Sequence, residues 1–81
     1  MFRPSQTWMF VSMFRFEWMN GTTIFSSEYD PGDEIHILAY TSRDPNKTGK
    51  SNNWIVRTKN GESVWSSLRM LKDRGIIELL S

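Results

Sequence analysis

Aromatic side chains fall at even-numbered positions along residues 8–19, and this alternation is typical of a β-strand with one apolar face. Asn20-Gly21 follows, which is a strong signal for a tight hairpin because both turn residues adopt positive φ. A return strand over residues 22–27 would place Phe25 opposite Phe16. The pattern predicts a hairpin with an aromatic face made of Trp8, Phe10, Phe14, Phe16 and Trp18.

Turn residues divide the middle of the chain into two further strands. A Pro-Gly pair within residues 28–33 predicts a turn, since proline presets φ and glycine accepts positive φ. The strand predicted over residues 34–41 is semi-apolar on both faces, as expected of a central strand. One face carries Ile35, Ile37 and Ala39, and the other carries His36, Leu38 and Tyr40. A polar loop over residues 42–53 separates it from a strand over residues 54–59.

A second Asn-Gly pair predicts another hairpin near the C-terminal third of the chain. Asn60-Gly61 would place Thr58 opposite Ser63 and Val56 opposite Trp65. This pairing requires the strand to continue through about Trp65.

The apolar period then changes from that of a strand to that of a helix. Val64, Leu68 and Leu71 lie at i, i+4 and i+7, so they predict one helical face. We expect this helix to begin between Ser63 and Ser67 and to end at Gly75, a residue suited to the position after a helix. Residues 76–80 are predicted to close the chain as a short strand.

These elements predict a mainly β protein in which residues 1–81 form one small domain. The run Gly32-Asp33-Glu34-Ile35, the strand led by Trp54 and the helical turn before the last strand resemble the SH3-like barrel. This resemblance covers about residues 29–80 and implies an antiparallel barrel of five or six strands with one short helix before the last strand. No Pro-Ser-x-Tyr segment of the proline-binding members is present. An open antiparallel sheet backed by the helix is the competing architecture.

Composition limits the binding partners and the cellular compartment that we expect. The net charge is +1, so no global field draws the chain to nucleic acid or to a membrane. The chain has no cysteine, which excludes disulfides and thiolate zinc sites and fits a cytoplasmic protein. No apolar run approaches the roughly 20 residues that a transmembrane helix needs.

Candidate catalytic chemistry is sparse, and we predict that the protein is not an enzyme and uses no cofactor or metal. His36 is the only histidine, and no serine lies in a Gly-x-Ser-x-Gly turn. Residues 28–34 hold four carboxylates without the spacing of a calcium loop, so a solvated turn explains them. The same carboxylates could meet a basic partner protein: Glu28, Asp30, Asp33 and Glu34.

The basic segment over residues 43–59 gives one function hypothesis. Its five cations face only one carboxylate, Asp44, and Trp54 lies among them. Cations that meet phosphates and an aromatic ring that stacks on bases suit single-stranded nucleic acid. The residues that would bind are Arg43, Lys47, Lys50, Trp54, Arg57 and Lys59.

The number of aromatic residues gives a second function hypothesis, which we favour. Four tryptophans, five phenylalanines and two tyrosines exceed what one face of a small domain can enclose. We therefore expect Phe2, Trp8 and Phe10 to be partly exposed and to contact a protein partner, or a second copy along the edge of the N-terminal strand. The separate acidic and basic segments also favour a protein partner. Small aromatic-rich domains of this kind resemble virus- or mobile-element-encoded modulators of host enzymes.

Overall fold

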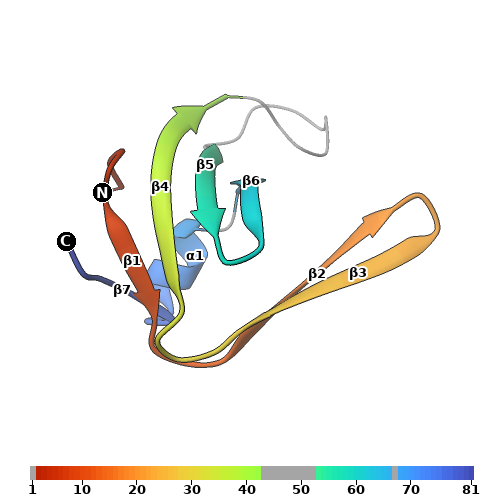
Figure 1. The fold of residues 1–81 in the computed structure, drawn as a ribbon, viewed down its shortest axis with the longest axis horizontal. Coiled ribbons are helices and arrows are strands. Elements are labelled where there is room, and N and C mark those ends of the chain that lie inside the picture. The colour runs from red at the N-terminus through yellow and green to blue at the C-terminus, as the bar shows by residue number, and fades with distance from the viewer. Residues whose placement is uncertain (1, 43–52, 67) are drawn as a thin grey trace.

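The computed structural model describes residues 2–42, 53–66 and 68–81, without the side chains of residues 18–20. These residues form seven strands and one helix (Figure 1). In chain order the elements are β1 (Thr7–Phe10), β2 (Phe14–Asn20), β3 (Thr23–Tyr29), β4 (Glu34–Thr41), β5 (Asn53–Thr58), β6 (Gly61–Trp65), α1 (Leu68–Asp73) and β7 (Ile77–Leu79). The mainly β class and the helix before the last strand are confirmed. The count of five or six strands is wrong, because the long first strand is divided.

Strand β1 and strand β2 belong to different sheets, although the sequence pattern runs through both. The break lies at residues 11–13, where the chain leaves the main sheet. The turn at the end of β3 holds this point, because the Phe10 N–H donates to the Asp33 carbonyl (2.9 Å) and the Gly32 N–H donates to the Phe10 carbonyl (2.8 Å). The Val11 N–H donates to the Ile76 carbonyl (2.9 Å). Backbone partners distant in the sequence therefore set the end of β1.

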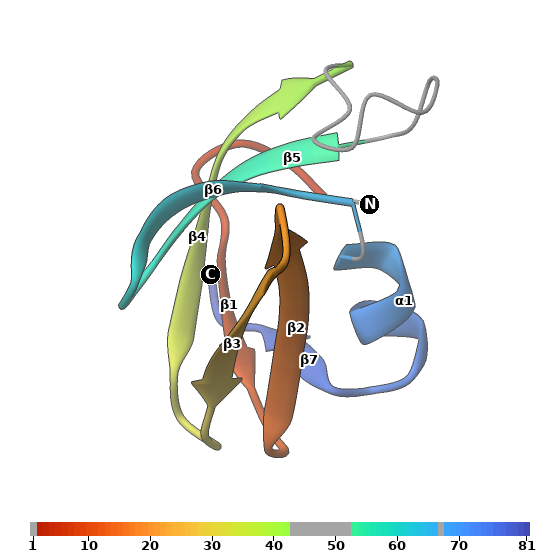
Figure 2. The ribbon, with the colours of Figure 1, turned by 90° about the vertical axis from the view of Figure 1, so that its right-hand side faces the viewer.

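The main sheet has five strands in the order β6-β5-β4-β1-β7, and β2 and β3 form a separate two-stranded ribbon. All the pairs are antiparallel. No hydrogen-bonded ladder joins β6 to β7 within the described residues, so the structure shows an open sheet without a closed barrel. Helix α1 lies on one side of this sheet (Figures 1 and 2). The β2–β3 hairpin leaves the lower end of the sheet in Figure 1.

The first hairpin forms where the sequence predicts it, but its register is shifted by two residues. Phe16 pairs with Ser27, and Phe25 pairs with Trp18, so the expected Phe16–Phe25 pair is wrong. Gly21, at φ 66°, is followed by Thr22 in the loop, and Asn20 is already paired with Thr23. A shift of two residues keeps every side chain on its predicted face, whereas a shift of one would invert the strand.

The second hairpin shows the same kind of difference. Thr58 pairs with Gly61, and Val56 pairs with Ser63, so the expected partners Ser63 and Trp65 are each displaced by two. The Thr58 hydroxyl accepts a hydrogen bond from the Asn60 N–H (3.0 Å), which tightens the loop around residues 59 and 60. Side-chain bonding in the loop therefore determines this register.

Strand β4 has the predicted bounds, but its faces change halfway. Ile35 and Ile37 are fully buried as expected. A β-bulge between Ile37 and Ala39 leaves Leu38 unpaired in the ladder with β5. Beyond the bulge, Ala39 is opposite Ile55 and Tyr40 is opposite Trp54, so Tyr40 shares the face of Trp54. The prediction that Ala39 shares the face of Ile37 is wrong for this reason.

The C-terminal helix is shorter than predicted, and Val64 lies in β6 instead. Leu68 and Leu71 are buried, as their spacing predicts. The Ile76 N–H donates to the Leu71 carbonyl (2.9 Å) and the Gly75 N–H donates to the Lys72 carbonyl (3.0 Å). Together with φ 70° at Gly75, these two bonds make the helix end that the sequence predicts. Strand β7 lies within residues 76–80, as expected.

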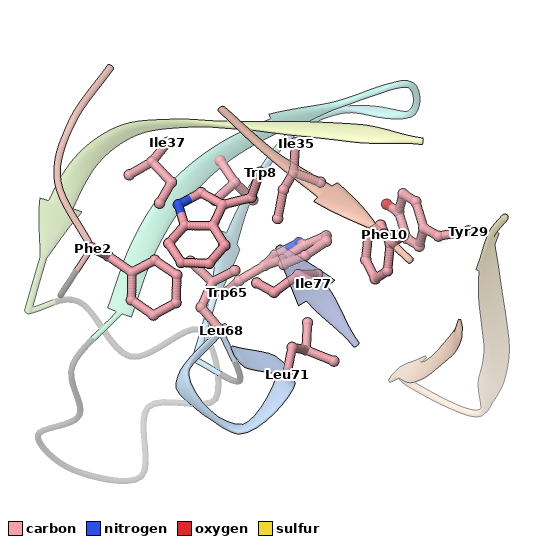
Figure 3. Close-up of a cluster of buried hydrophobic side chains, with 11 residues drawn as sticks. Phe2, Trp8, Phe10, Tyr29, Ile35, Ile37, Trp65, Leu68, Leu71 and Ile77 are labelled. Atoms are coloured by element: carbon pink, nitrogen blue, oxygen red, sulfur yellow. The ribbon is translucent and has the colours of Figure 1, made fainter. Parts of the chain in front are cut away.

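The core lies between α1, the main sheet and the root of the hairpin. Figure 3 shows that Leu68 and Leu71 point from α1 toward the aromatic and branched side chains of the sheet. At the other end of the core, the rings of Phe10 and Tyr29 stack with centroids 4.8 Å apart. The buried apolar set is Phe2, Trp8, Phe10, Tyr29, Ile35, Ile37, Val56, Trp65, Leu68, Leu71 and Ile77.

Candidate functional site

The three aromatic residues expected at the N-terminal surface are in the core. Phe2, Trp8 and Phe10 are only 7%, 5% and 0% exposed. The rings of Phe2 and Trp8 have centroids 4.8 Å apart, and the Trp8 indole N–H donates to Gln6 Oε1 (3.1 Å). The prediction that they are exposed is wrong, because the residues before β1 fold back and cover Trp8. In this structure, Trp8 and Phe10 therefore offer little surface to a partner.

The four acidic residues predicted to contact a partner protein have different surroundings in the structure. Glu28 forms an ion pair with Arg15 across the hairpin. The Asp33 carboxylate accepts a hydrogen bond from the Asp30 N–H (2.7 Å), which closes the turn. Glu34 starts β4, with its carboxylate 4.0 Å from the His36 ring. These carboxylates are in part engaged in ion pairs and turn bonding, which reduces what they offer to a basic partner.

The acidic and basic segments meet at one point, so the prediction that they are separate is wrong. Lys59 Nζ lies 2.8 Å from Asp33 Oδ2, and it lies 5.4 Å from the centre of the Tyr29 ring. The Tyr29 hydroxyl lies within hydrogen-bond distance of Thr58 Oγ1 (3.2 Å). These contacts join the root of the β2–β3 hairpin to the β5–β6 turn, and we call the group Asp33, Lys59, Tyr29 and Thr58 the clasp.

The clasp makes stability depend on pH. The hydrogen bond from Lys59, followed by that from the Asp30 backbone, lowers the pKa of Asp33 below its ordinary value of 3.8. A lowered pKa means that the folded protein binds this proton less readily than the unfolded chain does. The contribution of Asp33 is therefore present above its unfolded-state pKa and is lost as the pH falls through the folded-state pKa.

We expect Asp33→Asn to remove this part of the acid sensitivity. Urea melts from about pH 6 to about pH 2 should show the free-energy difference between wild type and Asp33→Asn shrinking on acidification. Asp30→Asn is the matched control, because it removes a neighbouring carboxylate and leaves the contact between Asp33 and Lys59 in place. A constant difference for Asp33→Asn would contradict the role of the clasp.

The basic segment is only partly described, because Arg43, Lys47 and Lys50 lie outside the described residues. Trp54 is half-buried, with its ring 6.1 Å from Phe2 and 5.2 Å from Tyr40 between centroids. Arg57 is exposed on β5, opposite His36 and Glu62. Lys59 is held in the clasp. The described members of this set do not form a continuous basic track.

The single histidine is placed on the main sheet. The His36 Nδ1 lies within hydrogen-bond distance of Thr7 Oγ1 (3.1 Å), which links β4 to β1. Among the described residues, no three side chains of His, Cys, Asp or Glu gather as a metal site would require. The same part of the chain forms no helix long and apolar enough to cross a membrane.

The outer part of the β2–β3 hairpin is the surface that sequence reasoning missed. Phe14 and Phe16 pack against the core, and the Phe16 and Trp65 ring centroids are 4.6 Å apart. Farther out, Ile24 and Phe25 are 64% and 40% exposed. The prediction placed Phe25 opposite Phe16, and the observed register places it opposite Trp18, closer to the tip.

Other exposed apolar side chains lie outside the hairpin. Leu79 and Leu80 are 47% and 48% exposed near the C-terminal end of the chain, and Met13 is exposed at the break between β1 and β2. Single exposed apolar residues are normal on protein surfaces. The hairpin differs because it projects from the body (Figure 1), and Ile24 and Phe25 expose one apolar side chain on each of its two faces.

Comparison of the chain with protein-family models, with curated protein sequences and with solved structures finds no match.

Proposed function

We propose that the protein is a non-enzymatic binding module that engages a partner protein through the outer part of the β2–β3 hairpin. The observation that supports this is the exposure of Ile24 and Phe25 on an arm that projects from the body. Successive strand residues point to opposite faces, so this arm offers an apolar side chain on each face, and exposed apolar groups on a projecting element mark interaction surfaces. The partner would present apolar groups to these two residues, because removing apolar surface from water is what makes such a contact favourable.

The nearly neutral charge favours a protein over a polyanion as the partner. The net charge is +1, and Arg15 and Lys59 are already paired with carboxylates. Binding of single-stranded nucleic acid by the basic segment stays a prediction. The cytoplasm as the location, and a virus- or mobile-element-encoded modulator of a host enzyme as the role, also stay predictions.

The experiment compares the wild-type protein with Ile24→Asn/Phe25→Ser as baits in extracts of the native source. We expect the same proteins to be retained by wild type and by Leu80→Ser, a control that removes an apolar side chain of intermediate exposure elsewhere. The double variant should lose them. With a purified partner, its affinity should fall about 30-fold or more, as for the loss of an apolar contact centre worth about 2 kcal/mol.

Urea melts of the three proteins are expected to match, which would show that the substitutions leave folding unaffected. Equal retention of the same partner by all three proteins would contradict the proposal. Loss of the partner by Leu80→Ser alone would place the binding surface at the C-terminal end.

A further inference from the structure

Strand β2 has one strand neighbour, and its other edge is available for pairing. The ribbon consists of β2 and β3 alone among the described residues. It projects from the body in Figure 1 and points toward the viewer in Figure 2. The outer edge of β2 therefore presents backbone N–H and carbonyl groups that another strand can use.

A two-stranded ribbon gains from a third strand. Isolated hairpins are marginally stable in water, and three or more strands are usual for a stable sheet. The inner end of this ribbon is held by the core and by the clasp, whereas its outer end lies beyond them. Residues 14–20 contain no proline, and their two charged side chains, Arg15 and Glu17, are of opposite sign.

The charges on β2 match those of a second copy of the same strand. Arg15 and Glu17 are exposed and lie two positions apart, on either side of Phe16. They therefore share one face of the ribbon. When two copies of β2 pair antiparallel around Phe16, Arg15 of each copy is opposite Glu17 of the other. Opposite charges in directly opposed positions stabilise a strand pair, and the two-fold symmetry provides the contact twice.

The neighbouring registers are disfavoured. Centring the pair on Glu17 brings the two Glu17 carboxylates together, and centring it on Arg15 brings the two guanidinium groups together. Like charges in opposed positions destabilise a strand pair. Within each copy, Arg15 also pairs with Glu28, whose hydrogen bond raises the pKa of Arg15. A row of alternating charge then crosses the joint sheet from Glu28 to Arg15 and on to Glu17 of the second copy.

We propose that two copies of this chain associate along β2 and form a four-stranded antiparallel sheet in the order β3-β2-β2-β3. This goes beyond the proposed function, because it uses the edge of β2 and leaves the Ile24 and Phe25 side chains of β3 for another protein. Each dimer would then carry two binding arms.

The test exchanges charges between two variants and measures mass by analytical ultracentrifugation. Variant A is Glu17→Arg. Variant B is Arg15→Glu with Glu28→Arg, which keeps an opposite pair within the hairpin. We expect wild type to dimerise and each variant alone to dimerise at least about 10-fold more weakly, because like charges then oppose each other at both symmetric positions. An equimolar mixture of A and B should restore the dimer, because every opposed pair is again of opposite charge.

The control is Glu78→Arg, which makes the same change of charge on β7 and should leave the dimer unchanged. A monomeric wild type at concentrations of about 0.5 mM, well above a dissociation constant in the micromolar range, would overturn the proposal. So would a dimer that resists both variants, or a mixture that stays monomeric. Partner retention by Ile24→Asn/Phe25→Ser is a separate readout, so either proposal can fail without the other.

Discussion

Phe10→Ala is expected to lower the free energy of unfolding by about 3–5 kcal/mol, which is a large part of the total for a small domain. The Phe10 ring is fully buried, and it stacks on Tyr29 while its centroid lies 6.5 Å from that of Trp65. It therefore joins the main sheet to the root of the hairpin. Replacing it leaves a cavity at this junction, because the backbone of β1 is fixed on both edges and cannot move in to fill the space. Urea denaturation followed by tryptophan fluorescence measures the loss.

Met13→Ala is the matched control for Phe10→Ala. Met13 is 69% exposed and lies three residues away, outside the strand. We expect this change to alter the free energy of unfolding by less than about 0.5 kcal/mol, as for surface substitutions in general. A loss below about 1 kcal/mol for Phe10→Ala would mean that the ring is not part of the core.

Leu71→Ala should destabilise the protein by about 2–5 kcal/mol. Leu71 is fully buried and attaches α1 to the sheet (Figure 3). A helix as short as α1, Leu68–Asp73, cannot persist through intrinsic propensity, so its packing against the sheet must hold it in place. We therefore expect the variant to lose helical signal at lower denaturant concentrations than wild type.

Arg69→Ala provides the comparison within the same helix. Its side chain is 85% exposed, and its only described ion pair, with Asp73, is solvated at 3.8 Å. Because alanine is the better helix former and exposed ion pairs stabilise little, the change should stay within about 0.5 kcal/mol. Equal effects at positions 69 and 71 would contradict the burial of Leu71.

Local chemistry predicts several elements of this fold. Strand β4 has the expected bounds because Gly32 and its neighbours force a turn before it. The Asp33 N–H donates to the Asp30 carbonyl (3.0 Å) there, and Gly32 has φ 99°. Gly75 likewise ends α1, because glycine adopts the positive φ at this position without strain. In both places, the residues that decide the structure are adjacent in the sequence.

The features that sequence reasoning missed depend on distant residues. The break after β1 is set by backbone bonds from Phe10 to Asp33 and from Val11 to Ile76. The bulge at Leu38 appears only when β5 pairs with β4. The contact of Lys59 with Asp33 likewise requires two turns to come together. No pattern within a short window encodes such contacts.

The candidate site was misplaced for a related reason. A count of aromatic residues predicts that some are exposed, but it does not say which. Phe2 and Trp8 are buried because the residues before β1 fold back, and Phe25 is exposed because the observed register moves it outward. Which ring is covered follows from the register and from the path of the chain.

The central position of β1 has a consequence for synthesis. Trp8 pairs with Ile35 on one side and with Leu79 on the other. On a ribosome, the second side stays open until the segment around Leu79 has been made, a delay of several seconds at roughly 5–20 residues per second. During this interval the nascent chain presents a bare edge beside its largest rings, and unpaired edges of this kind are prone to aggregation.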